Sequence, residues 1–383
     1  MNKVCIVTGS RAEYGLLKKL ITELDQAEKI NLQLVVTGMH LAPEFGSTWK
    51  IIQKDGFTID EKVENLLSSD TVGGVSKAIG LGVIGFSDVF ERLTPDIIIL
   101  LGDRFEILSA AIASCIANIP IAHLHGGELT EGLYDDSIRH SITKMSRYHF
   151  TSHEIYKQRV IQMGEQPSCV FNVGAFGLDS IKETKMLSKK DLEKELNFKF
   201  GEKNLLVTFH PETITEEDPH KQINELISAL DEWNANIIFT MPNADSFGRS
   251  LAAAIKRFVH LDPLRRCVHT SLGQVKYFSA LSLVDGVVGN SSSGLIEAPS
   301  FKKGTINIGS RQQGRLKAES VIDCGATKVE ILTALETLYS MKFQKKISQQ
   351  KNPYDNGGAS KKVLKFLKEW DPSIGLKKFY DLN

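Results

Sequence analysis

The sequence predicts an α/β protein of two Rossmann-like domains that face each other across a cleft. Three observations lead to this prediction. Short, apolar, β-branched runs alternate with longer helical patterns, as in parallel sheets covered by helices on both faces. This alternation restarts after residues 182–203, a stretch rich in Lys and Glu. The chain also has 383 residues, more than a single hydrophobic core usually supports.

The first half of the chain contains six strand candidates, each a run of apolar or β-branched residues. Four stretches between them place apolar residues at helical spacing. The second half restarts the pattern with five further strand candidates. The strands are expected at 3–8, 32–37, 96–101, 120–124, 148–151 and 169–173, the helices at 14–24, 75–93, 105–117 and 136–147, and the later strands at 204–209, 236–240, 268–271, 286–288 and 304–308.

This pattern also predicts the domain boundaries. The first domain is expected at 1–181 and carries most of the candidate catalytic residues. A hinge region follows at 182–203, and the second domain occupies 204–358. The remaining residues, 359–383, begin with a helical pattern, and we expect this helix and tail to fold back on the first domain.

The charge balance excludes several classes of partner. The 46 basic and 46 acidic residues cancel, so no overall field attracts nucleic acid or an anionic membrane. The most apolar stretch, 107–121, is too short to span a membrane and is interrupted by Asn118 and Pro120. Five scattered cysteines without a CxxC pair favour a reducing compartment. A strand begins at residue 4, which leaves no room for a signal peptide, so we expect a cytoplasmic protein.

Acids and imidazoles are concentrated just after two predicted buried strands, 97–101 and 119–122. Side chains beyond the carboxyl ends of parallel strands line the ligand crevice of an open sheet. Several such groups together indicate proton transfer on a polar substrate. The candidates are Asp103, His123, His125, Glu128, Asp135, Asp136 and His140.

Two of these side chains, His123 and His125, also have a spacing that zinc enzymes use, because alternate residues of a strand share one face. A metal at this position would not explain Asp103 and Asp136. We therefore expect no metal ligand in the chain, and the metal site remains the less favoured alternative.

Two strand-to-helix turns are candidates for binding phosphate. The first, VTGSRAEYG at 7–15, offers backbone amides at a helix N-terminus and the guanidinium of Arg11. The second, VVGNSSSGLIEAPS at 287–300, offers amides and three consecutive hydroxyls, Ser291, Ser292 and Ser293. Ordinary helix capping also favours Gly and Ser at such turns. Three serines in a row exceed what capping needs, so the second turn is the stronger candidate.

Further polar side chains accompany these turns. Glu297 is expected one turn into the helix after the serines, where it can accept hydrogen bonds from a ribose diol. Arg311 and Arg315 follow the next strand and are positioned to close on the same phosphates. His210 ends the first strand of the second domain, and Asn243 follows the next strand, where it can bind a base or a hydroxyl.

The motifs together resemble the hydrolysing UDP-N-acetylglucosamine 2-epimerases of the bacterial sialic-acid pathway. The resemblance extends in order from residue 7 to residue 315 and implies the two-domain GT-B fold. The matching motifs are TGSRAEYG, VTGMH, LGDRFE, HLHGGE, DDSIRHSITKMS, FHPET, GNSSSGLIE and NIGSRQQGR.

This resemblance implies roles for individual residues. Asp103, Asp136 and the HGGE loop correspond to catalytic positions, and His210 is a further candidate catalytic residue. Many relatives have Glu where this chain has His125, so the base at C2 of the sugar is one of His125, Glu128 and Asp136. The contacts to UDP correspond to Arg11, Arg104, His210, Asn243, Ser291, Ser292, Glu297 and Arg311.

The implied reaction removes the C2 proton while UDP leaves C1, which gives a 2-acetamidoglucal. Water then adds to release N-acetylmannosamine, without a nicotinamide or metal cofactor. A 2,4-diacetamido-trideoxy sugar on UDP, the legionaminic-acid precursor, is an alternative substrate. A GT-B glycosyltransferase and a sugar-nucleotide sensor are alternative functions.

We also expect a homo-oligomer, either a dimer or a tetramer. The apolar, glycine-rich stretch 72–93 is a candidate subunit interface. Packing within the first domain is an equally good explanation of the same pattern.

Overall fold

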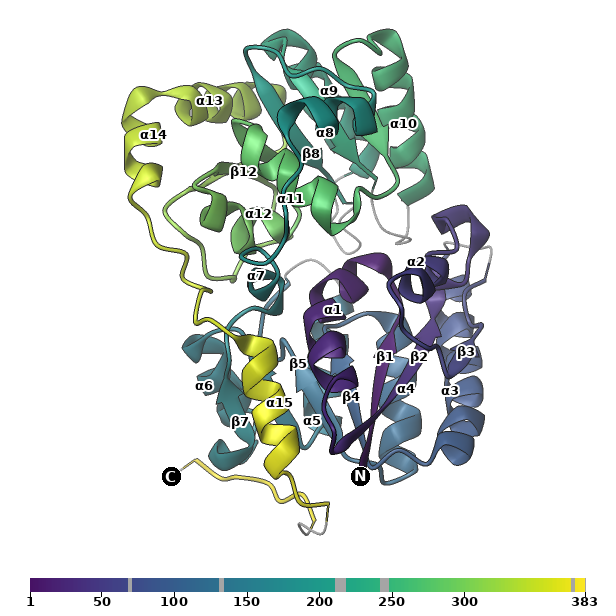
Figure 1. Cartoon of the computed structure of the whole chain (residues 1–383). Coiled ribbons are helices and arrows are strands. Elements are labelled where there is room, and N and C mark those ends of the chain that lie inside the picture. The colour runs from purple at the N-terminus through teal and green to yellow at the C-terminus, as the bar shows by residue number, and fades with distance from the viewer. Residues whose placement is uncertain (68–70, 131–133, 211–217, 242–247, 373–375, 383) are drawn as a thin grey trace. The chain divides into compact units, whose positions relative to one another are not determined.

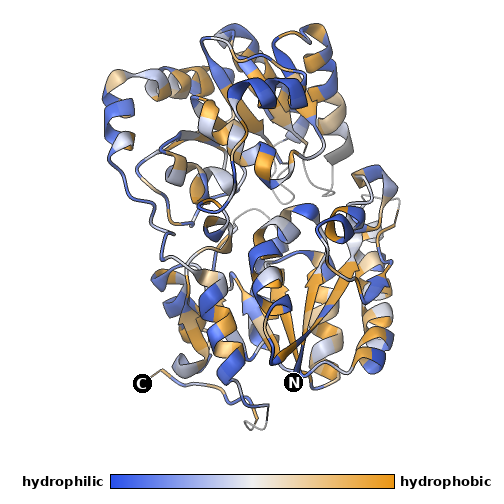
Figure 2. Ribbon diagram, viewed as in Figure 1, coloured by the Kyte–Doolittle hydropathy of each residue, from blue (hydrophilic) through white to orange (hydrophobic). Residues whose placement is uncertain are grey.

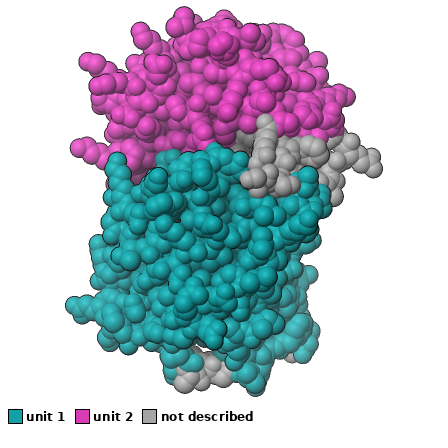
Figure 3. All heavy atoms as spheres, turned by 90° about the vertical axis from the view of Figure 1, so that its right-hand side faces the viewer, with its two compact units in different colours: residues 1–128, 134–180, 356–383 teal, residues 129–133, 181–355 magenta. Residues whose placement is uncertain are grey.

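The structure is a computed structural model that describes residues 1–67, 71–130, 134–210, 218–241, 248–372 and 376–382. The chain divides into two compact units, coloured separately in Figure 3. Unit 1 contains residues 1–128, 134–180 and 356–383, and unit 2 contains residues 129–133 and 181–355. Each unit is built on one parallel sheet, so the predicted fold class, two Rossmann-like α/β domains, is confirmed.

Unit 1 contains a seven-stranded sheet in the order β3-β2-β1-β4-β5-β6-β7. Every neighbouring pair is parallel. The central strand β4 has all five residues buried, which explains its continuous apolar sequence IIILL. The strands are β1 (Asn2–Thr8), β2 (Ile30–Thr37), β3 (Glu61–Val63), β4 (Ile97–Leu101), β5 (Ile121–Leu124), β6 (Tyr148–Thr151) and β7 (Val170–Asn172).

Helices cover both faces of this sheet (Figure 1). One hydrophobic core joins α1 and α15 to the strands, and another joins α3 and α4 to the opposite face. Figure 2 shows the strands as the most hydrophobic part of the unit. The helices are α1 (Arg11–Asp25), α2 (Trp49–Lys54), α3 (Val72–Leu93), α4 (Phe105–Ile116), α5 (Tyr134–Met145), α6 (Glu154–Gln162), α7 (Phe176–Asp179) and α15 (Ala359–Glu369), with short 3-10 turns η1 (Gly38–His40), η2 (Pro43–Phe45) and η3 (Pro167–Cys169).

Helix α3 is, among the described residues, the one helix long and apolar enough to cross a membrane by length and composition alone. In this structure it packs against α4, and its residues Ala78, Phe86 and Phe90 belong to the core of unit 1.

The C-terminal helix α15 is part of unit 1. Its first two amides, those of Ala359 and Ser360, donate to the two carboxylate oxygens of Asp179 at 3.0 and 2.7 Å. An acceptor at this position satisfies helix N–H groups that have no partner within the helix. At the far end, the indole of Trp370 donates to the hydroxyl of Tyr148 at 2.9 Å.

Unit 2 contains a six-stranded parallel sheet in the order β10-β9-β8-β11-β12-β13. Its strands are β8 (Asn204–Thr208), β9 (Asn236–Thr240), β10 (Arg266–His269), β11 (Gly286–Gly289), β12 (Gly304–Ile308) and β13 (Val321–Cys324). Its helices are α8 (Lys189–Leu196), α9 (Pro219–Trp233), α10 (Gly248–Leu261), α11 (Gly273–Leu283), α12 (Ser293–Ile296), α13 (Lys328–Tyr339) and α14 (Met341–Ser348), with the 3-10 turn η4 (Ala298–Phe301). Helix α8 lies in the predicted hinge region and buries Leu192 and Leu196 in a core of unit 2.

The strand order identifies where each sheet can bind a ligand. In both sheets the order reverses next to the first strand of the unit, between β1 and β4 and between β8 and β11. Open α/β sheets bind ligands outside the carboxyl ends of the strands at such a switch point. The residues that follow these four strands include Arg11, Asp103, His210 and the three serines 291–293.

Candidate active site

The turn between β1 and α1 is closed by its own side chains. The Glu13 carboxylate accepts hydrogen bonds from the amides of Gly9 and Ser10 at 2.7 and 3.1 Å, and the Ser10 hydroxyl accepts from the amide of Glu13 at 3.3 Å. This capping box occupies amides that the sequence offered to a phosphate. Arg11, the first residue of α1, remains the cationic group of this turn, and burial lowers its pKa.

A second buried carboxylate lies next to the first. Arg104 donates two hydrogen bonds to Glu106, at 3.2 and 3.1 Å, and the Glu106 side chain is fully buried. Arg104, which the resemblance places against UDP, therefore holds an internal carboxylate in this structure. Burial raises the pKa of the nearby Glu13 to about 8, although the cation of Arg104 opposes this shift.

Asp103 and Glu128 are joined by an arginine that the sequence analysis did not single out. Arg139 of α5 donates to the carboxylate of Asp103, and its other terminal nitrogen lies 3.5 Å from Glu128 Oε2. The residue is only 2% exposed. Burial lowers the pKa of Arg139, but the carboxylates of Asp103 and Glu128 more than compensate, so its pKa is raised. This cation therefore stays charged between two carboxylates.

His125 and Glu128 form a fixed pair in the HGGE loop. The Nδ1 of His125 lies 2.8 Å from Glu128 Oε1, and the amide of Phe176 donates to His125 Nε2 at 3.4 Å. Because Nε2 accepts, the hydrogen-bond network assigns the proton to Nδ1, which donates to Glu128. The Ser152 hydroxyl donates to the same Oε1 atom at 2.6 Å. Both ring nitrogens of His125 are thus engaged within the protein.

The four candidate catalytic residues of unit 1 differ sharply in exposure. The side chains of Glu128 and His125 are 4% and 8% exposed, whereas Asp103 and Asp136 reach 20% and 31%. Asp136, on the first turn of α5, also lies 3.4 Å from the Nε2 of His140 one turn later. Solvent, and hence a substrate, reaches Asp103 and Asp136 far more readily than the buried pair.

His123 is a buried structural residue. Its Nε2 lies 2.8 Å from the carbonyl oxygen of Gly102 and its Nδ1 lies 3.1 Å from the Thr143 hydroxyl. Burial lowers the pKa of this imidazole to about 3, so it is neutral at physiological pH. Within the described ranges, no three His, Cys, Asp or Glu side chains come together as a group that would hold a metal ion.

In unit 2, an asparagine that the sequence analysis passed over connects the two strands of the switch point. The Asn290 side chain accepts from the amide of His210 at 2.7 Å and donates to the carbonyl of His210 at 2.8 Å. The preceding Gly289 has a φ of +131°, and a Cβ there would collide with the carbonyl of Thr208. The turn after β11 therefore requires this glycine, and the asparagine fixes His210 beside it.

The serines after Asn290 start a helix of four residues, α12. All three are half-buried, and the Ser293 hydroxyl accepts a hydrogen bond from Tyr277 at 2.6 Å. Glu297 comes one turn after the start of α12, but as its C-cap it ends the helix instead of lying inside it, and it is 7% exposed. Proline at 299 and the 3-10 turn that follows end the α-helix early.

The two arginines after β12 have different partners. Arg311 donates to the carbonyl of Asn290 at 3.0 Å, which places it at the serine turn. Arg315 donates to the Leu129 carbonyl at 2.7 Å and to the Thr130 hydroxyl at 3.0 Å. Arg311 thus lies where the sequence analysis expected a phosphate contact, whereas Arg315 binds the chain just after the HGGE loop. Asn243 lies outside the described residues.

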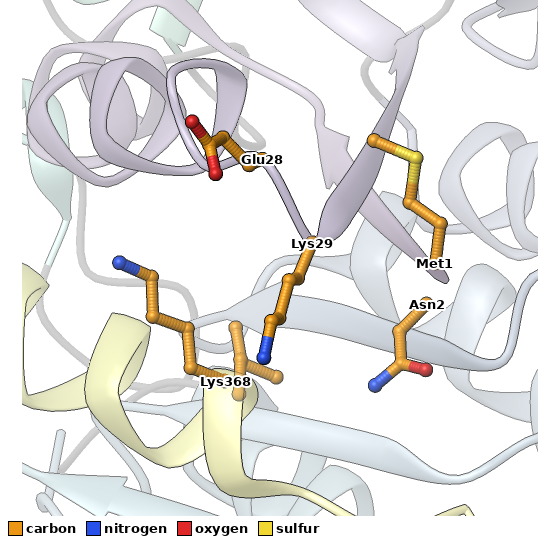
Figure 4. Close-up of a pocket in the computed structure, with 6 residues that line it drawn as sticks. Met1, Asn2, Glu28, Lys29 and Lys368 are labelled. Carbon is orange, nitrogen blue, oxygen red and sulfur yellow. The ribbon is translucent and has the colours of Figure 1, made fainter.

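Figure 4 shows a cavity in unit 1, which has a volume of about 290 Å³. It lies at the amino ends of β1 and β2, whereas Asp103 follows the carboxyl end of β4. Its lining comes from the start of β1, the loop before β2 and the end of α15. The polar lining residues are Asn2, Glu28, Lys29 and Lys368, none of which belongs to the motifs of the candidate site.

Comparison with known proteins identifies one family. A sequence model described as UDP-N-acetylglucosamine 2-epimerase matches residues 22–368. The chain is 43% identical to a GDP/UDP-N,N'-diacetylbacillosamine 2-epimerase (hydrolyzing) of Campylobacter jejuni, over 89% of this chain and 88% of that one. It is 39% identical to the polysialic acid biosynthesis protein P7 of Escherichia coli, over 100% and 98% of the two chains.

Solved structures agree on the fold. Staphylococcus aureus MnaA in its co-structure with UDP superposes with a TM-score of 0.81 at 17% identity, covering 100% of both chains. At this identity the likeness establishes the two-domain, GT-B-like fold.

Proposed function

Because the chain belongs to the UDP-N-acetylglucosamine 2-epimerase family, we propose that it is a hydrolysing 2-epimerase of a UDP-linked 2-acetamido sugar. The reaction releases UDP from C1 and a proton from C2, which gives a 2-acetamidoglucal. Water then adds its hydroxyl to C1 and a proton to C2 from the opposite face. The products are UDP and the free sugar with inverted configuration at C2.

One observation carries this proposal. Two half-buried carboxylates, Asp103 and Asp136, lie at the carboxyl edge of the sheet in unit 1. Asp103 pairs with Arg139, which also lies 3.5 Å from Glu128, and Asp136 lies on the same helix as Arg139. Removal and return of a proton at carbon need a base and an acid at fixed positions. A sensor that only binds a sugar nucleotide has no need for two such acids.

The geometry favours Asp136 as the group that removes the C2 proton. His125 has both nitrogens engaged, and Glu128 accepts hydrogen bonds from two side chains while it lies close to Arg139. Hydrogen bonds to the charged form of a carboxylate make it a weaker base. Asp136 is the most exposed of the three alternatives, and Asp103 supplies the second acid of the sugar site.

We propose that the UDP portion is held mainly by the turns of unit 2. His210, Asn243, Ser291, Ser292, Ser293, Glu297 and Arg311 provide these contacts. The leaving diphosphate gains negative charge as the C1–O bond breaks, and the Arg311 cation and turn amides stabilise this charge. Arg11 adds a further cation from the first turn of α1.

We further propose UDP-N,N'-diacetylbacillosamine as the first candidate substrate, because the relative at 43% identity is named a GDP/UDP-N,N'-diacetylbacillosamine 2-epimerase. UDP-N-acetylglucosamine is the second candidate, because the family model that matches residues 22–368 carries that name. Incubation with each UDP-sugar in turn, without any acceptor, distinguishes them by the kcat/KM for UDP release.

The same incubation tests the reaction class. We expect UDP together with a free sugar inverted at C2, which is N-acetylmannosamine in the case of UDP-N-acetylglucosamine. A glycosyltransferase would require an acceptor and would leave C2 unchanged, and a binding protein would release no UDP. Either of those results with both substrates would contradict the proposal.

A further inference from the structure

The C-terminal tail of the chain, residues 376–382, contacts the rest of unit 1 through the ammonium group of Lys377, which has several hydrogen-bond acceptors there. The Nζ of Lys377 donates to the carbonyl oxygens of Lys144 and Ser146, both at 2.6 Å, and to Glu165 Oε1 at 2.9 Å. An ammonium group has three N–H donors, so each of them has an acceptor here.

Two of these acceptors belong to the end of α5. The helix ends at Met145, so the carbonyls of Lys144 and Ser146 lie at its C-terminus. The last carbonyls of a helix have no partner within the helix and carry its partial negative charge. The Lys377 ammonium therefore acts as a cap that is supplied from more than 230 residues away in the sequence.

The third acceptor, Glu165, is 1% exposed and receives two further donors. The Nε2 of His149 lies 3.0 Å from one oxygen and the Nζ of Lys144 lies 2.6 Å from the other. Burial opposes the ionisation of Glu165, yet hydrogen bonds from His149, Lys144 and Lys377 lower its pKa to about 2. The carboxylate is therefore charged at physiological pH and balances the cation of the tail.

Aromatic and backbone contacts attach the same segment to α6 and the loop after it. The amide of Tyr380 donates to the carbonyl of Gly164 at 2.9 Å, and the Tyr380 ring packs against Val160 and Ile161. The ring of Phe379 lies over Gly164, where φ is +86° and a Cβ would collide with the ring. Its centroid is 4.8 Å from the Lys144 Nζ.

We propose that residues 376–382 form a clasp on unit 1, in which Lys377 is a positioning residue that caps α5 and thereby holds Asp136 and Arg139. Both residues lie on α5, eight and five positions before Lys144. A helix rises 1.5 Å per residue, so the clasp acts on Asp136 across about 12 Å of helix. The catalytic part of this inference rests on the proposed function, whereas the capping part does not.

The first experiment compares Lys377→Met with Lys378→Met in the full-length protein. Lys378 is the exposed neighbour with the same charge and serves as the matched control. Hydrogen exchange of the amides at 143–146 should become about 10-fold faster or more in Lys377→Met, because a charged hydrogen-bonding partner of the helix end is lost. We also expect kcat to fall several-fold at an unchanged KM, with neither change in the control.

The second experiment supplies the tail in trans. A variant without residues 376–383 should show the same faster exchange, and a synthetic peptide of the sequence LKKFYDLN should restore slow exchange and kcat. A peptide in which Met replaces the first lysine should restore neither. Recovery by the peptide shows that the truncated chain is folded, and Glu165→Gln provides an independent disruption of the same site.

Equal exchange in Lys377→Met and Lys378→Met would overturn the capping role. Faster exchange with an unchanged kcat would overturn the positioning role. If the wild-type protein turns over neither UDP-sugar, the proposed function fails, while the exchange and peptide measurements still decide whether the clasp exists.

Discussion

The two switch points share a topology but differ in the chemistry of their loops. In unit 1, the loops after β1, β4 and β5 and the helices that follow them contain buried carboxylates and arginines, with Arg139 of α5 close to both Asp103 and Glu128. In unit 2, the loops after β8 and β11 are held by a neutral amide, Asn290, and display hydroxyls next to one arginine. Acids and bases that transfer protons must be held in position by neighbouring charges, whereas a bound diphosphate needs hydrogen-bond donors. The difference assigns catalysis to one unit and nucleotide binding to the other in our proposal.

The largest expected effect comes from Asp136→Asn, which keeps the shape of the side chain and removes its charge. Loss of a positioned acid or base typically slows a reaction by ~10²–10⁴-fold. UDP affinity should change little, because the nucleotide is assigned to unit 2. Turnover and calorimetry with UDP measure the two quantities separately. Near-normal turnover would show that Asp136 is structural.

Arg139→Met tests whether the network of unit 1 depends on its buried cation. Removing one partner from a buried ion pair leaves uncompensated charge and costs about 3–5 kcal/mol of unfolding free energy. Arg92→Met serves as the control, since the Arg92–Glu61 pair lies on the surface and should contribute little. Urea unfolding measures the unfolding free energy of both variants. An equal loss in Arg139→Met and Arg92→Met would contradict the account.

The substitution Glu13→Gln tests how a buried carboxyl of unit 1 makes the stability of the protein depend on pH. Burial raises the pKa of Glu13 to about 8 in the folded protein, against an ordinary value of 4.5. The folded state therefore binds this proton more tightly, and stability decreases as the pH rises from about 4.5 to about 8, by at most about 1.4 kcal/mol per pH unit. The variant should lack this decrease. Thermal unfolding across that pH range measures the stability of both proteins. If stability changed with pH in the same way in the wild type and in Glu13→Gln, the prediction would be refuted.

Ser291→Ala combined with Ser292→Ala tests the nucleotide turn of unit 2. Loss of hydrogen bonds to a charged ligand should weaken UDP binding by about 1–3 kcal/mol. Ser228→Ala, an exposed serine of α9, should leave the affinity unchanged. Equal UDP affinity of the double variant and the control, measured by calorimetry, would move the phosphate site elsewhere.

The smallest expected effect is that of chelation. We expect dialysis against EDTA to leave turnover intact, because the acids are assigned to proton transfer and both nitrogens of His123 are bound within the protein. Activity that is lost on dialysis and restored by one divalent ion would contradict this assignment.

Much of the fold was predictable because its central strands are continuous apolar runs. The exceptions are the edges of the sheets. Strand β3 has three residues, two of them charged, and β13 is partly exposed, so neither gives a clear apolar run. Helix α8 was overlooked because its Lys and Glu residues dominate the composition, although Leu192 and Leu196 are four residues apart and Ser188 caps the helix.

The candidate site was predictable in its residues but not in its connections. Asp103 and Glu128 could be recognised by their positions after strands. Arg139 and Asn290 could not, because their importance depends on partners 36 and 80 residues away. His125 was an equal candidate for the base until the structure showed both ring nitrogens engaged, with φ at +63°. The side chain of Asp136 is more exposed than that of Glu128, and this difference likewise arises only in the folded structure.

The most direct test of the central claim is the isotope at C2 of the product formed in deuterated water. Elimination removes the C2 proton, and the acid that restores a proton to C2 exchanges with solvent. The account therefore predicts a released free sugar that carries deuterium at C2 and is inverted there. A free sugar with protium retained at C2 would contradict the elimination mechanism and the roles assigned to Asp103 and Asp136.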